Sequence, residues 1–167
     1  MSQLAPQATL TVAMTSFSSE RIVTAISRLV SEFCHVILAD ADAASRFHMA
    51  AHELAENVVK YSTGPRVSIE VALEEFEDGA RLEVRASNET TPERLQEVEG
   101  RLRELAEAED PVALYDRLIM ETAPRTDVSG LGLARIRAEG ELNIDYSIEG
   151  NALTVTVHAP VTTREGS

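Results

Sequence analysis

The fold is decided by the stretch HELAENVVKYS, which occupies residues 52–62. At about 100° per residue, its apolar positions fall on one face of a helix, the face that would pack on a sheet. Glu53, Asn57 and Lys60 share a stripe along one edge of that face. An acid, an amide and a cation are therefore expected to stack over two helical turns at the border of the core.

This polar stripe has two interpretations. As the wall of a pocket, it would let the Asn57 side-chain oxygen bind Mg²⁺, because hard ions prefer oxygen ligands. Glu53, one turn earlier, could accept a proton from a hydroxyl group or water, and Lys60 could face a phosphate group. As a plain solvated edge, the stripe would instead hold Glu56 and Lys60 as an i,i+4 ion pair. The spacing alone favours the solvated edge, so the first interpretation needs a second motif.

Outward from this stretch, the periodicity of apolar residues predicts an alternation of strands and helices. Thr91-Pro92 and Asp110-Pro111 each combine an N-cap residue with a proline suited to the first helical turn. The expected strands cover residues 8–14, 67–73, 82–86, 142–148 and 152–159, and the expected helices cover 19–37, 43–62, 92–105, 111–122 and 132–139. This order predicts an α/β fold, a two-layer sandwich with a mixed sheet and helices on one face. It forms a single domain over residues 1–160, followed by a disordered tail over 161–167.

Composition and charge restrict the class of protein. The 167 residues are 44% apolar, which is enough for a core without disulfides. The formal net charge of −13 argues against nucleic acid and anionic membranes as partners, because both bind clustered Lys and Arg. The charge serves solubility or offers an acidic face to a basic partner protein. No segment has the pattern of a signal peptide or a membrane span, and Cys34 has no second cysteine to pair with, so a cytoplasmic location is expected.

A second motif, SGLGL at residues 129–133, leads into the last predicted helix. Gly130 and Gly132 would let the backbone approach a ligand closely, and the start of a helix offers free N–H groups that suit a phosphate. The motif is not a Walker loop, because no lysine follows its glycines, and it lacks the third glycine of the dinucleotide fingerprint. Alone, it is more typical of a plain junction between a loop and a helix.

Taken together, the two motifs resemble those of the GHKL superfamily of ATP-binding proteins. Residues 53–62 are similar to the N box of that family, and residues 129–133 are similar to its second glycine box. The order of the two boxes and the predicted hairpin between them also agree. The resemblance covers roughly residues 8–159 and implies a Bergerat-type fold.

The resemblance also implies roles for individual residues. Asn57 would hold Mg²⁺ and Glu53 would act as the general base. The phosphates of ATP would be bound by the backbone of Gly130, Leu131 and Gly132, beside the Lys60 that the helical spacing already places near a phosphate. Asn88 stands where the family usually has the aspartate that recognises the adenine amino group, and no glycine follows it over 89–92. An amide can still hydrogen-bond adenine, but with a different arrangement of donors and acceptors.

A narrower resemblance concerns the region after Asn88. A long helical insert followed by a Gly-Leu-Gly-Leu loop resembles the SiaB-type switch-protein kinases, which lack the same glycines and phosphorylate a small partner protein. The first hypothesis is therefore a bacterial Mg-ATP-dependent serine/threonine kinase of a small switch or anti-sigma antagonist protein. The second is an inactive pseudokinase that regulates by binding a sigma factor or an antagonist. The leucine stripe at 95–105 is either core or a surface for a homodimer or a partner.

Overall fold

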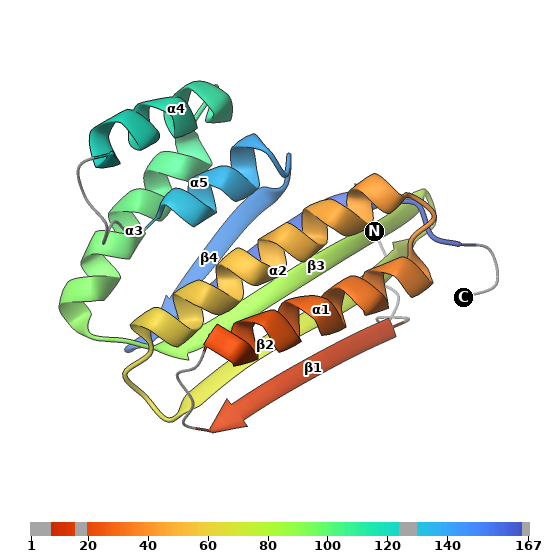
Figure 1. Ribbon diagram of the computed structural model, residues 1–167, viewed down its shortest axis with the longest axis horizontal. Coiled ribbons are helices and arrows are strands. Elements are labelled where there is room, and N and C mark those ends of the chain that lie inside the picture. The colour runs from red at the N-terminus through yellow and green to blue at the C-terminus, as the bar shows by residue number, and fades with distance from the viewer. Residues whose placement is uncertain (1–7, 16–19, 124–129, 165–167) are drawn as a thin grey trace.

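The computed structural model describes residues 8–15, 20–123 and 130–164. These residues form five strands and five helices in the predicted order (Figure 1). The elements are β1 (Ala8–Thr15), α1 (Glu20–Ile37), α2 (Ala41–Tyr61), β2 (Arg66–Phe76), β3 (Gly79–Glu89), α3 (Pro92–Glu107), α4 (Pro111–Thr122), α5 (Leu131–Ala138), β4 (Asn143–Glu149) and β5 (Ala152–Val161). Ser129, the first residue of the SGLGL motif, lies outside the described residues.

The strands form one sheet in the order β1-β2-β3-β5-β4. Every pairing between neighbours is antiparallel, so the prediction of a mixed sheet was wrong. The connection from β1 to β2 runs out along α1 and back along α2, which returns β2 antiparallel to β1. β4 does run parallel to β3, but β5 lies between them in the sheet. The two-layer α/β sandwich itself is confirmed.

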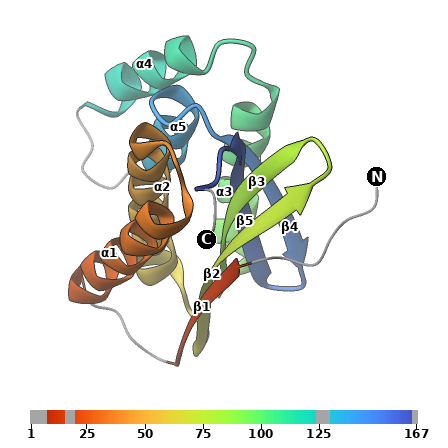
Figure 2. The same ribbon diagram turned by 90° about the vertical axis from the view of Figure 1, so that its right-hand side faces the viewer.

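The helices cover one face of the sheet, as predicted (Figure 2). The buried face of α2 is rich in alanine, which lets the helix lie close to the strands, and its largest buried side chains are Phe47 and Leu54. Burying each of these two side chains stabilises the fold by roughly 1.5–3 kcal/mol. α4 lies at the outer edge of the molecule, beyond α5 (Figure 1). Among the described residues, no helix combines the length and the apolar character that crossing a membrane requires.

The opposite face of the sheet is open and polar. Glu83 on β3 is nevertheless only 1% exposed, because it lies between Arg81 and Arg85 and forms ion pairs with both. Thr156 on β5 lies opposite Arg85 in the register and belongs to the same open face. A buried, charge-paired glutamate on this face contrasts with the aliphatic side chains under the helices.

Helix capping follows the sequence signals. Asp110 Oδ1 accepts a hydrogen bond from the Ala113 N–H at 2.9 Å, and Thr91 Oγ1 accepts one from the Arg94 N–H at 3.4 Å. A proline stands in the first turn of each of these helices. These caps satisfy backbone donors that have no partner within the helix, so the predicted starts of α3 and α4 are confirmed.

Residues 161–164 correct the expectation of a tail that is disordered from residue 161 onward. The Ala39 N–H donates to the Thr162 carbonyl at 2.9 Å, and the Arg164 N–H donates to the Ile37 carbonyl at 2.9 Å. Arg164 Nε also donates to the Leu38 carbonyl at 2.8 Å. The chain beyond β5 is held there because the end of α1 leaves backbone carbonyls free to accept. Residues 165–167 lie outside the described residues.

Candidate functional site

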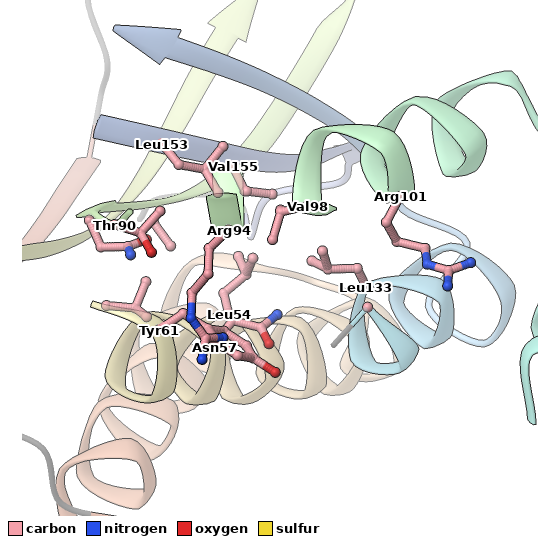
Figure 3. A pocket seen from close by; sticks show the side chains of 14 residues that line it. Leu54, Asn57, Tyr61, Thr90, Arg94, Val98, Arg101, Leu133, Leu153 and Val155 are labelled. Atoms are coloured by element: carbon pink, nitrogen blue, oxygen red, sulfur yellow. The ribbon is translucent and has the colours of Figure 1, made fainter. Parts of the chain in front are cut away.

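A cleft lies between α2, α3 and the start of α5, with the ends of β3 and β5 as its floor (Figure 3). Its free internal volume is about 40 Å³, which holds a few water molecules, so a larger ligand would need the side chains that cross the cleft to move. Its polar lining residues are Asn57, Tyr61, Asn88, Thr90, Arg94, Arg101 and the backbone of Gly130. The remaining lining is apolar and comes from Leu54, Val58, Ala86, Val98, Leu133, Leu153 and Val155.

The cleft brings together parts of both sequence motifs. Asn57 on α2 and Gly130 at the start of α5 line it together, although they are far apart in the sequence, and Asn88 lines it as well. Lys60 does not line the cleft: it is exposed, and its ammonium nitrogen lies 5.1 Å from the centre of the Tyr61 ring. Glu56, expected to pair with Lys60, instead has its Oε1 atom 3.5 Å from His52 Nε2.

Glu53 lies just behind the lining, against α5. Its side chain is 15% exposed, and its Oε1 accepts a hydrogen bond from Arg135 Nη1 at 3.3 Å. A Cβ atom on Gly132 would collide with its Oε2 atom, so a larger residue there would require the Glu53 carboxylate to move. Burial raises the pKa of the Glu53 carboxyl above its usual value, and the charge of Glu56 raises it further. The Arg135 guanidinium acts in the opposite direction and lowers this pKa.

The start of α5 is shaped by Gly130. Its φ of 97° is one that glycine adopts without strain. A Cβ atom there would lie 2.6 Å from Arg101 Cγ, so the arginine stem packs directly on the Gly130 backbone. Arg101 Nη1 in turn donates to Glu104 at 2.7 Å. No side chain in the described part of the chain caps α5, so its first N–H groups lack a side-chain acceptor there.

We use "glycine end" for Gly130 and Arg101 together with the adjoining Glu53, Gly132 and Arg135. Every charged side chain in this set has an ionic partner, because Arg101 pairs with Glu104, and Arg135 pairs with both Glu53 and Glu139. Leu131 belongs to the same turn and packs against the core. The glycine end therefore combines closely packed backbone with a network of paired charges.

The other end of the cleft, here the "amide end", consists of Tyr61, Asn88, Thr90 and Arg94. Asn88 is 8% exposed, and its Nδ2 donates a long hydrogen bond of 3.4 Å to the Glu89 carbonyl. Thr90 is 3% exposed, and no described residue offers its Oγ1 a hydrogen-bond partner. The Arg94 guanidinium lies 4.9 Å from the centre of the Tyr61 ring and reaches across from α3 to α2 (Figure 3).

The sequence analysis missed several of these residues. Arg94 and Arg101 are seven residues apart on α3 and so share one helical face. This spacing is visible in the sequence, beside the leucines of the same helix. Thr90 follows Asn88 by two residues, which places both on the same side of the chain as β3 ends. Arg135 had no such signal, because it is 82 residues from Glu53. Leu95, Leu102 and Leu105 are buried, so the leucine stripe is core and not a surface.

The described residues contain no group of three or more His, Cys, Asp or Glu side chains that could hold a metal ion. The oxygens that Asn57, Tyr61, Asn88 and Thr90 offer in the cleft are all neutral, so a cation there would need further oxygens from a ligand or from water. The oxygens of this cleft therefore suit a cation that is bound to a ligand and enters the cleft with it.

Comparisons with known proteins support the fold. No family model matches the chain, and no curated protein matches it. The chain is similar to a chain in the crystal structure of the SiaB-SiaC complex from Pseudomonas aeruginosa, with a TM-score of 0.63 and 17% sequence identity. The match covers 91% of this chain and 89% of that chain. At this identity the similarity shows a shared fold over nearly the whole length of both chains.

Proposed function

We propose that this chain is a regulatory protein of the GHKL type, which binds Mg-ATP in the cleft and phosphorylates a serine or threonine of a small partner protein. The observation that carries the proposal is the meeting of Asn57 and Gly130 in one cleft, with Glu53 one helical turn from Asn57. The fold shared with a chain of the SiaB-SiaC complex supports a role in which the protein works through a protein partner.

The glycine end suits the phosphates. The first N–H groups of α5 and the adjacent Arg101 give partial and full positive charge where a polyphosphate would lie. Asn57 would donate one oxygen to Mg²⁺, and phosphate oxygens and water would complete its shell. The bound ion would neutralise charge on the phosphate oxygens. Catalysis in such a site rests mainly on positioning and on charge stabilisation.

Glu53 would act as the proton acceptor. Its raised pKa, caused chiefly by burial, makes it a stronger base than an exposed glutamate. The hydroxyl oxygen of the partner would attack the γ-phosphorus while its proton passes to the Glu53 carboxylate. The bond from the γ-phosphorus to the bridging oxygen would break, and ADP would leave with that oxygen. In the free protein this carboxylate accepts a hydrogen bond from Arg135 and lies against Gly132, so the hydroxyl group of the partner would have to reach it there.

A second candidate function is binding without turnover. Arg94 crosses the cleft to stack on Tyr61, and it occupies space that a nucleotide base would need. A protein in which this stack never opens would regulate its partner by surface contact alone. The two candidates differ in whether Mg-ATP binds, and this can be measured directly.

The test is a thermal-shift titration with Mg-ATP. A ligand at about 100 times its Kd should raise the Tm by roughly 5–10 °C, because it binds only the folded state. Asn57→Ala should remove this shift, whereas Asn143→Ala, on the exposed end of β4, should keep it. Glu53→Ala should keep the shift and lower phosphotransfer by at least about 100-fold. Transfer is followed with γ-labelled ATP and proteins captured by the chain from its own cell lysate.

Each outcome separates the candidates. A shift that needs Asn57, together with label transfer that needs Glu53, supports the kinase. A shift without transfer to any captured protein would support nucleotide binding but refute phosphotransfer to those proteins. The absence of any shift with Mg-ATP would refute nucleotide binding in this cleft and support the second candidate, regulation by surface contact alone.

A further inference from the structure

Thr90 carries a buried hydroxyl group that points to a ligand. It stands just after β3, is 3% exposed and lines the cleft. No described residue pairs with its Oγ1, although its backbone N–H donates to the Asn151 carbonyl at 2.9 Å. Buried polar groups in folded proteins are almost always hydrogen-bonded. A hydroxyl in this position is therefore suited to a partner that enters the cleft.

Asn88 lies beside this hydroxyl on the same strand end. Its amide is 8% exposed, and its Nδ2 makes only a long hydrogen bond of 3.4 Å to its neighbour's carbonyl. A carboxamide presents one donor group and one acceptor atom, and a hydroxyl can both donate and accept. Asn88 and Thr90 can therefore form hydrogen bonds with a ligand edge whose donor and acceptor stand in either arrangement.

The surroundings of the pair favour a flat, apolar ring. Leu153 lies opposite Asn88 on β5, and Val155 lies opposite Ala86, so aliphatic side chains form the floor there. Tyr61 supplies an aromatic face on which the Arg94 guanidinium now stacks (Figure 3). A heteroaromatic ring that displaces the guanidinium would gain the same stacking surface.

We propose that Asn88 and Thr90 form a base subsite that accepts adenine and guanine alike. This inference rests on the proposed nucleotide function and adds the class of base to it. Adenine presents an amino donor beside a ring-nitrogen acceptor, and guanine presents a carbonyl acceptor beside a ring N–H donor. The Asn88 amide can pair with the first arrangement in one orientation and with the second after a rotation of 180°. The Thr90 hydroxyl turns to suit either base.

The experiment measures the Kd values of non-hydrolysable ATP and GTP analogues with Mg²⁺ by calorimetry. The wild-type chain should bind the two analogues within about tenfold of each other. Thr90→Val should weaken both by about 3- to 10-fold, the usual effect of one lost hydrogen bond. Thr156→Val, the same change on the open face of the sheet, should leave both Kd values unchanged.

Asn88→Asp gives the sharper test. A carboxylate only accepts hydrogen bonds, so it still suits the adenine amino group but faces the guanine carbonyl with a like charge. Guanine binding should fall by at least about tenfold relative to adenine binding. The unliganded Tm of each variant, measured alongside, shows that it is folded.

The possible failures are distinguishable. If neither analogue binds the wild-type chain, the proposed function and the base subsite are both refuted. If the ATP analogue binds but Thr90→Val changes nothing, the hydroxyl serves only water and the subsite is refuted. A wild-type preference of more than about 100-fold for one purine would also refute it, while leaving nucleotide binding intact.

Discussion

The two ends of the cleft differ in whether their polar side chains already have partners within the protein. At the glycine end, Arg101 and Arg135 each have a glutamate partner within hydrogen-bond distance, and the Glu53 carboxylate lies where a Cβ atom of residue 132 would stand. At the amide end, Thr90 has a buried hydroxyl for which the described residues provide no partner. The first end must therefore exchange internal contacts for those of a ligand, whereas at the second end the Thr90 hydroxyl has no hydrogen bond to a described residue that it must give up. We expect substitutions at the glycine end to disturb function and stability together, and those at the amide end to separate them.

The largest effect is expected for Gly132→Ala. The new methyl group would collide with the Glu53 carboxylate and push it away from Arg135. Because the colliding atoms belong to the end of a flexible side chain that can swing away, the free energy of unfolding should fall by no more than about 1 kcal/mol. Because the proposed base would also be displaced, phosphotransfer should fall by about 100-fold or more. Urea unfolding and the γ-label assay measure the two losses.

Gly100→Ala is the matched control for that change. Gly100 lies within α3, and a Cβ atom there meets no other atom within 4 Å. Alanine is the better helix former, so this variant should be more stable by roughly 0.5–1 kcal/mol and keep its phosphotransfer rate. Equal behaviour of the two alanine variants would show that Gly132 does not confine Glu53.

A smaller effect, visible mainly in a pH profile, is expected for Arg135→Gln. Arg135 lowers the pKa of Glu53, opposing the larger effect of burial, so its removal should raise this pKa further. A general base works only when deprotonated, so the acid limb of the kcat profile should move to higher pH. At alkaline pH the variant should approach the wild-type rate.

Arg137→Gln serves as the comparison, because Arg137 lies on the same helix but bonds Asn143 and not Glu53. Its acid limb should coincide with that of the wild-type protein. An unmoved acid limb in Arg135→Gln would mean that Arg135 has no influence on the protonation of Glu53. The amide end should show no such pH effect, since it contains no acidic side chain.

The sequence predicted the parts of this contrast that depend on local patterns. The helical spacing of residues 52–62 placed Asn57 on the border of the core, and Thr91-Pro92 located the start of α3. It could not predict that Arg135 reaches Glu53, because that contact depends on how α5 packs on α2. It also predicted a mixed sheet, since helices between strands often connect parallel neighbours. The order β3-β5-β4, which separates the parallel pair, follows from long-range packing.

The smallest effect, and the one that best separates the two ends, is the stability of Thr90→Val without ligand. Valine has nearly the shape of threonine but lacks the hydroxyl group, which is buried and has no described partner. Removing such a group should stabilise the unliganded fold by about 1 kcal/mol, or roughly 3 °C in Tm. Thr156→Val on the open face should stay within about 0.5 kcal/mol of the wild-type protein. A clear loss of stability in Thr90→Val would show that the hydroxyl is already bonded in the free protein, and the contrast between the two ends would then disappear.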